Sequence, residues 1–383
     1  MTDIVAAAEA LKPEISVRAD EIEQARRLPR DLAATIARAG LFRMATPREI
    51  GGLEASPADI FRAIEAVSEA DASAGWCVMI GTTSGMTSAW LPAGIARPIF
   101  GPPETIACGV FAPMGRALED GDDYVVSGKW QWASGSANCD WLMGGSAIIA
   151  DGAPKKLANG ALNSRMIIFP RDKVELIDSW NVSGLCGTGS GEMVVRDLRV
   201  PKSHSASIVT DRPHAQGALY VFPVFGLLAL GVASVLLGNA RAAVGELVAL
   251  AGGKRPQGSA RALAERATAQ ATLAENVARL RAARALMRET VEEAWDKARA
   301  TGEVDLAQRA ALRLAATHAA RTATAVTREM AELGGGSSVF LSSPLQRRMR
   351  DAFVGAQHMM VAPQTNELTG RYLMGLPTDA SFL

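Results

Sequence analysis

The 383-residue sequence has few of the residues that build disulfide frameworks, metal sites or nucleic-acid surfaces. It holds only four cysteines and four histidines, and aromatic residues make up 5%. The cysteines are far apart and form no Cys-x-x-Cys pair, so we expect no metal site and no disulfide framework, and a reducing cytoplasm as the location. Forty basic residues balance forty acidic ones, and no basic run is interleaved with aromatics. We therefore expect no nucleic-acid partner and no anionic-membrane partner.

Long uncharged runs are also scarce. The exception is 215–240, which lacks Asp, Glu, Lys and Arg and is long enough to span a bilayer. Pro223, Gly226 and Gly231 interrupt this run, and no Lys/Arg cluster flanks it, so a helix buried inside a bundle is the favoured interpretation. The N-terminus has no apolar leader, and we expect no signal peptide.

The most informative stretch is 124–141, YVVSGKWQWASGSANCDW. Its alternation places Trp130 and Trp132 on one face of a predicted strand, and the small residues of 133–136 follow. A flat aromatic wall beside small hydroxyl groups suits a planar heterocyclic ligand. A Trp-rich core strand that ends in a tight turn explains the same residues, and the stretch alone does not choose between the two.

The pattern of the sequence changes twice. Helical periodicity covers about 1–100, where Ser56, Pro57 and Asp59 form a helix start. Short β-branched runs follow, with 119–123 as a hairpin turn. Long helical patterns return from about Phe225, and the last main helix is predicted at 345–374.

This order predicts an α+β protein in three parts. We expect an N-terminal helical domain at 1–101, a middle β domain at 102–214 and a C-terminal antiparallel helical bundle at 215–383.

The same order, with Trp132-Ala133-Ser134 in its middle, resembles the acyl-CoA dehydrogenase superfamily over essentially the whole chain. Further resembling motifs are Ala-Gly-Leu-Phe at 39–42 with Pro-Arg-Glu-Ile-Gly-Gly at 47–52, and three glycines at 334–336 followed by Pro344 and Arg350-Asp351. The resemblance implies an acyl-CoA dehydrogenase-like fold and a flavin cofactor. It implies that Trp132 packs against the flavin ring and that Ser134 hydrogen-bonds near the N5 and O4 edge. The other implied cofactor contacts are Ser136, Thr188, Gly334, Gly335 and Gly336.

The sequence departs from the dehydrogenase pattern at the catalytic base. The position eight residues beyond Asp351, where many acyl-CoA dehydrogenases have a carboxylate, is Met359. A thioether cannot accept the α-proton of an acyl thioester. Glu246 is the nearest acid that could serve as a relocated base. The family's adenine-side motif has lost its aromatic residue in 254–258, Lys-Arg-Pro-Gln-Gly.

Gln357-His358, together with 187–190 and Ser134-Gly135, is similar to the group D two-component flavin-dependent monooxygenases, which carry the type 2 C-terminal domain. This similarity implies a homotetramer that takes reduced flavin, FMN or FAD, from a separate reductase and oxygenates an aromatic or heterocyclic small molecule. It implies catalytic roles for His358, on the last bundle helix, and for Ser134. Such a role calls for a histidine with a pKa near neutral. The alternative for His358 is an ordinary polar residue at a subunit contact.

Three functions follow from the sequence. The first is the oxygenase component of a flavin-dependent monooxygenase, and the second is an acyl-CoA dehydrogenase or related flavin oxidase with a relocated base. The third is a non-catalytic binding or assembly module on the same fold. The sequence names no substrate.

Overall fold

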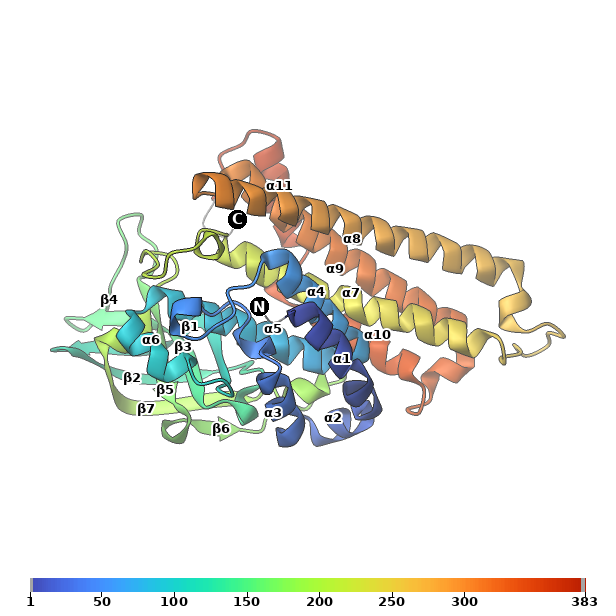
Figure 1. Ribbon diagram of the computed structural model, residues 1–383, viewed down its shortest axis with the longest axis horizontal. Coiled ribbons are helices and arrows are strands. Elements are labelled where there is room, and N and C mark those ends of the chain that lie inside the picture. Colours follow the sequence, from blue (N-terminus) through green and yellow to red (C-terminus); the bar gives the residue numbers. More distant parts are fainter. Residues whose placement is uncertain (1–2, 380–382) are drawn as a thin grey trace.

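The computed structural model describes residues 3–379 and 383, in which short helices, one sheet and a bundle of long helices follow one another along the chain (Figure 1). The N-terminal α-helices are α1 (Ile4–Val17), α2 (Ala19–Ala25), α3 (Arg30–Arg38), α4 (Pro57–Ala70), α5 (Ala72–Met86) and α6 (Ala93–Phe100). Helix α5 contacts both the sheet and the bundle, because it packs against strand β1 and against α7.

The predicted helix start at Ser56 is confirmed. The Ser56 side chain accepts a hydrogen bond from the Asp59 backbone N–H at 3.1 Å, and Pro57 is the first residue of α4. Proline costs nothing there, since the first backbone N–H groups of a helix have no partner within the helix.

One mixed sheet forms the middle of the chain. Its strands are β1 (Ala107–Asp120), β2 (Asp123–Trp130), β3 (Trp141–Ala150), β4 (Ala153–Pro154), β5 (Ser164–Pro170), β6 (Glu175–Ile177), β7 (Glu192–Pro201) and β8 (Ser205–Ala206). Their order is β6-β7-β2-β1-β3-β5-β8, with β4 paired to β3. Strands β1 and β3 run parallel, whereas β1 and β2 form the predicted antiparallel hairpin, in which Asp120 faces Asp123.

The two tryptophans of β2 and its turn do not share a face, so that prediction is wrong. Trp130 is the last residue of β2 and is fully buried, whereas Trp132 lies beyond the strand and is 58% exposed. A Cβ atom added to Gly115, Gly128 or Gly144 would lie 2.3–2.5 Å from the Trp130 ring. These glycines make room for the indole, so Trp130 is a core residue.

The bundle consists of α7 (Val224–Ala251), α8 (Ala267–Thr301), α9 (Leu306–Gly334), α10 (Pro344–Gly355) and α11 (Gln364–Leu373). Helix α7 is long and apolar enough to cross a membrane, but 89% of its most apolar window is buried, and it packs against α4 and α9. The buried-helix interpretation of this segment is therefore confirmed.

The prediction of one helix over 345–374 is wrong, because the chain leaves α10 at Gly355 and starts α11 only at Gln364. Pro363 lies in the break, and Ala362 before it has the extended ψ of 154° that a following proline favours. The break contains the short 3₁₀ helix η11 (Met359–Val361). His358 thus lies in a connection and not on a helix.

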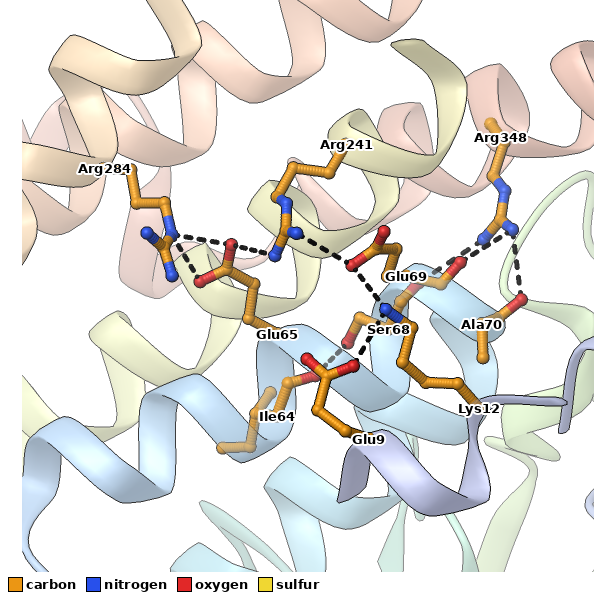
Figure 2. A network of polar contacts seen from close by, with 10 residues as sticks. All are labelled: Glu9, Lys12, Ile64, Glu65, Ser68, Glu69, Ala70, Arg241, Arg284 and Arg348. Atoms are coloured by element: carbon orange, nitrogen blue, oxygen red, sulfur yellow. Dashed lines mark hydrogen bonds and ion pairs between the residues drawn. The ribbon is translucent and has the colours of Figure 1, made fainter. Parts of the chain in front are cut away.

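A network of charges joins the N-terminal helices to the bundle (Figure 2). Glu65 of α4 is buried and pairs with Arg241 of α7 at 3.1 Å and with Arg284 of α8 at 2.8 Å. Arg348 of α10 donates to the Glu69 and Ala70 carbonyls at the end of α4, at 2.9 and 3.0 Å. These contacts join α4 to α7, α8 and α10.

Candidate active site

The turn after β2 presents Trp132 to solvent on a strained backbone. Trp132 has a φ of +62°, a region that bulky residues rarely adopt. Two hydrogen bonds from the following residues to the 188–191 segment hold the turn, namely Ala133 N–H to the Gly191 carbonyl at 3.0 Å and Gly135 N–H to the Thr188 carbonyl at 2.8 Å. The turn therefore displays an uncovered indole next to Ser134.

A chain of buried hydroxyl groups begins at Ser134. The Trp76 Nε1–H of α5 donates to Ser134 Oγ at 3.2 Å, and Ser134 Oγ lies 2.6 Å from Ser190 Oγ. Ser190 Oγ lies 2.7 Å from Thr188 Oγ1, which donates to the Leu185 carbonyl at 2.8 Å. The three hydroxyl residues are at most 5% exposed.

The two ends of this chain fix the direction of its protons. An indole N–H only donates and a carbonyl oxygen only accepts, and each hydroxyl has one proton. Since Thr188 gives its proton to Leu185, Ser190 must donate to Thr188, and Ser134 must donate to Ser190. Reversing the direction would leave the oxygen atoms of Thr188 and Leu185 facing each other at 2.8 Å without a proton. Ser134 therefore offers a ligand a lone pair and not a proton.

His358 lies beside the same tryptophan. Its ring meets the Trp76 indole edge to face, with centroids 5.6 Å apart and planes at 70°. The Met360 backbone N–H donates to His358 Nδ1 at 3.3 Å. A neutral imidazole that accepts at Nδ1 carries its proton on Nε2, so the Nε2–H group is the hydrogen-bond donor of this ring.

His358 is neutral at pH 7. Burial, and after it the positive charge of Arg313, lowers the pKa of His358 to about 4. The expectation of a pKa near neutral is wrong for the protein without ligand, because the ring lies between packed helices and close to a cation.

Asp351 ties the hydroxyl chain to α10. Its carboxylate accepts a hydrogen bond from the Leu185 backbone N–H at 2.6 Å, and Leu185 has a φ of +50°. Leu185 opens the short 3₁₀ helix η6 (Cys186–Thr188). Burial, and after it the nearby charge of Asp71, raises the pKa of Asp351 to about 7. The carboxyl group that positions the Thr188 segment thus titrates near neutral pH.

Asp351→Asn is expected to stabilise the protein at alkaline pH. The pKa of this carboxyl is raised on folding, so its contribution to stability is full below about pH 4 and is lost as the pH rises through about 7. An amide oxygen still accepts from Leu185 but does not ionise. We expect a gain of about 2–4 kcal/mol at pH 8 and little change at pH 4, measured by chemical denaturation at each pH.

Asp172→Asn, which changes an exposed carboxylate, is the control and should show no such trend. The stability contribution of His358 changes with pH in the opposite direction to that of Asp351. Because folding lowers the pKa of His358, the folded protein loses stability as the pH falls from about 6.5 towards 4. An Asp351→Asn variant with the same stability difference at pH 4 and pH 8 would contradict this account of the carboxyl.

The structure brings Trp132, Ser134, Thr188 and His358 together through Trp76 and Ser190. The glycines of 334–336 lie elsewhere, and their predicted contact with the phosphate end of the cofactor stays a prediction. These glycines lie near the start of α10, where the Lys254 ammonium donates to Ser337 Oγ at 2.5 Å. Gly355, at the end of α10, packs against Trp76. Twelve helical residues separate the two places by about 18 Å.

Two other candidates are Ser136, whose contact with the cofactor stays a prediction, and Glu246. Ser136 is buried at the start of the 3₁₀ helix η4 (Ser136–Asn138). Glu246 forms an ion pair with Arg348 at 3.0 Å. This carboxylate is already bonded to a guanidinium, so the geometry does not favour Glu246 as a relocated base. Within 3–379 and 383, no group of three or more His, Cys, Asp or Glu residues is suited to a metal ion.

Comparisons with known proteins identify the family and the fold. Family models described as "Acyl-CoA dehydrogenase, N-terminal domain" and "Acyl-CoA dehydrogenase, C-terminal domain" match 5–93 and 230–363. An indole-3-acetate monooxygenase of Pseudomonas putida is 33% identical over 94% of this chain and 90% of that protein. The oxygenase component of an FADH(2)-dependent resorcinol hydroxylase of Rhizobium sp. is 27% identical over 95% of this chain and 92% of that protein. The crystal structure of the HsaA monooxygenase from M. tuberculosis superposes with a TM-score of 0.90 at 27% identity, covering 100% of this chain and 99% of that one.

Proposed function

The chain belongs to the acyl-CoA dehydrogenase family and is the oxygenase component of a flavin-dependent monooxygenase, and we propose that it oxygenates an aromatic or heterocyclic small molecule at the Ser134–His358 site. The observation that carries this proposal is the joint position of Ser134 and His358 around Trp76, with a thioether at the position of the dehydrogenase base. Substrates of the relatives include indole-3-acetate and resorcinol, as their names state.

The residues around the turn fit a flavin. Trp132 exposes 58% of its surface on a fixed turn, which suits stacking against a flat ring, and Ser134 presents a lone pair beside it. Reduced flavin, when bound, supplies the activation of O₂. The protein's contribution is to orient the ring with Trp132 and Ser134, to exclude water from the buried hydroxyl chain and to hold the Nε2 proton of His358 as a donor.

The proton direction in the hydroxyl chain favours reduced flavin. The N5 atom of a reduced flavin bears a hydrogen that a lone pair can accept, whereas N5 of an oxidised flavin needs a donor. Ser190→Ala frees the Ser134 proton. We expect this change to lower the ratio of reduced to oxidised FMN affinity by about 10-fold, the scale of one hydrogen bond. Ser203→Ala, a change at an exposed serine, is the control for anaerobic titrations of both redox states.

Activity tests separate the monooxygenase from the alternatives. We expect an oxygenated product only when O₂ and a flavin reductase with NADH are supplied. We expect no bleaching of FAD by acyl-CoA under nitrogen. Acyl-CoA-dependent flavin reduction would favour the dehydrogenase, and no affinity for flavin in either redox state would favour the non-catalytic module.

We further propose a cytoplasmic homotetramer with a separate flavin reductase as partner. The four cysteines are free thiols, in keeping with a reducing compartment. Large apolar side chains stay exposed before, along and just after α10. The most exposed of them are Val339, Phe340, Leu341, Phe353 and Met359, at 61–82%. Such a surface is typical of a subunit interface. Light scattering at micromolar protein should give four times 40.2 kDa, and a monomer would contradict the assembly.

A further inference from the structure

Arg313 is a buried guanidinium with two nitrogen atoms that lack a hydrogen-bond partner among the described residues. Arg313 on α9 is 2% exposed, and its Nε and Nη1 atoms are buried without a hydrogen-bond partner in the described part of the chain. Burial alone lowers the pKa of Arg313, to about 10, so the group stays charged at pH 7. A buried charge without a counter-ion destabilises a fold, and proteins keep such a charge where a ligand needs it.

The neighbours of Arg313 on the same helical face have partners. Four residues earlier, Arg309 donates to the Leu383 carbonyl at 2.9 and 2.7 Å. Four residues later, Thr317 Oγ1 lies 2.6 Å from Thr365 Oγ1. Residues four apart share a face of a helix, so this face of α9 is directed at the chain that follows α10.

That chain segment contains His358. Met360 and Val361 of η11 are buried where η11 contacts α7 and α9. The charge of Arg313 is close enough to the imidazole to help lower its pKa. An anion bound to Arg313 would therefore lie on the face of α9 that is directed at the segment containing the proposed catalytic histidine.

We propose that Arg313 binds the carboxylate of the substrate, so that this oxygenase acts on aromatic or heterocyclic acids. The proposal rests on the proposed function, because it assigns the acid group of the molecule that is oxygenated at His358 and Ser134. A guanidinium binds a carboxylate through two parallel hydrogen bonds, which fixes the orientation of the ring attached to it. The bound carboxylate also offsets the charge that Arg313 exerts on His358.

Paired acids and amides test the proposal. The probes are indole-3-acetate, phenylacetate and their primary amides, titrated by calorimetry into wild type, Arg313→Met and Arg328→Met. Arg328 lies on the same helix but is exposed and paired with Glu332. We expect wild type and Arg328→Met to bind an acid at least about 10-fold more tightly than its amide. Arg313→Met should bind the acids about 10- to 100-fold more weakly and the amides as before. Equal affinity of wild type for acids and amides overturns the proposal.

A flavin phosphate is the other anion that Arg313 could hold. Titrations with reduced FMN and reduced riboflavin distinguish the two sources, because only FMN has a phosphate. We expect Arg313→Met to bind both flavins as wild type does. A selective loss of FMN affinity assigns Arg313 to the cofactor and overturns the substrate assignment.

Stability gives a readout that does not depend on catalysis. Without ligand, Arg313→Met should melt at or above the wild-type temperature, because the change removes an unpaired buried charge. A marked loss of stability would mean that Arg313 is paired in the native protein. Acid binding without any oxygenated product would count against the proposed function alone, whereas product formed equally well from amides and acids would count against the role of Arg313 alone.

Discussion

His358→Ala is expected to lower oxygenated product by about 10²-fold or more, with a matching rise in hydrogen peroxide. The imidazole is neutral and has its proton on Nε2, because Nδ1 accepts from the Met360 N–H. Removing it takes away the donor next to Trp76 and Ser134, so that oxygen consumed by the reduced flavin is no longer directed to the substrate. Product and peroxide are quantified together with oxygen uptake, under a fixed supply of reduced flavin.

The neighbouring Gln357→Ala is the matched control. Gln357 is exposed, and its side chain donates to the Phe353 carbonyl at 2.9 Å within its own turn. It should keep wild-type coupling. His358→Ala should also fold and bind reduced flavin normally, since an edge-to-face ring contact contributes only about 1 kcal/mol. Wild-type product yield in His358→Ala would remove the histidine from the mechanism and favour the alternative of a structural polar residue.

Local signals in the sequence predicted the parts of the fold that depend on local chemistry. The start of α4 at Ser56 and the hairpin between β1 and β2 follow from residues within one turn of the structure. The long uncharged segment of α7 was identified as a buried helix because proline and glycine interrupt it. These features need no knowledge of distant contacts.

The site depended on contacts that sequence spacing does not show. Trp132 and Ser134 were found through their motif, but Trp76 and Ser190 lie 58 and 56 residues from Ser134. Alternation placed Trp132 on the same strand face as Trp130, although the strand ends two residues before Trp132 and the Trp132 backbone is left-handed. A run of hydroxyl residues between glycines at 187–190 was the available signal for Ser190, and Trp76 gave none beyond that of a packing residue.

Arg348→Ala is expected to destabilise the protein by about 3 kcal/mol, the lower end of the cost of removing one partner of a buried ion pair, because this pair is partly buried. The Arg348 guanidinium bonds to Glu246 at 3.0 Å. It also donates to the Glu69 and Ala70 carbonyls that end α4 (Figure 2). Its loss leaves these carbonyls without a donor and leaves the Glu246 carboxylate, 20% exposed, without a counter-ion. Denaturant unfolding measures the change.

The double variant Arg348→Ala/Glu246→Ala shows which part of that cost belongs to the stranded carboxylate. It should be less destabilised than the sum of the single variants, by about 1–3 kcal/mol, because no unpaired charge remains. Arg328→Ala, which breaks an exposed pair with Glu332, should change stability by no more than about 0.5 kcal/mol. Additive effects of Arg348→Ala and Glu246→Ala would show that Glu246 is not held by Arg348, and Glu246 would again become a candidate for the relocated base.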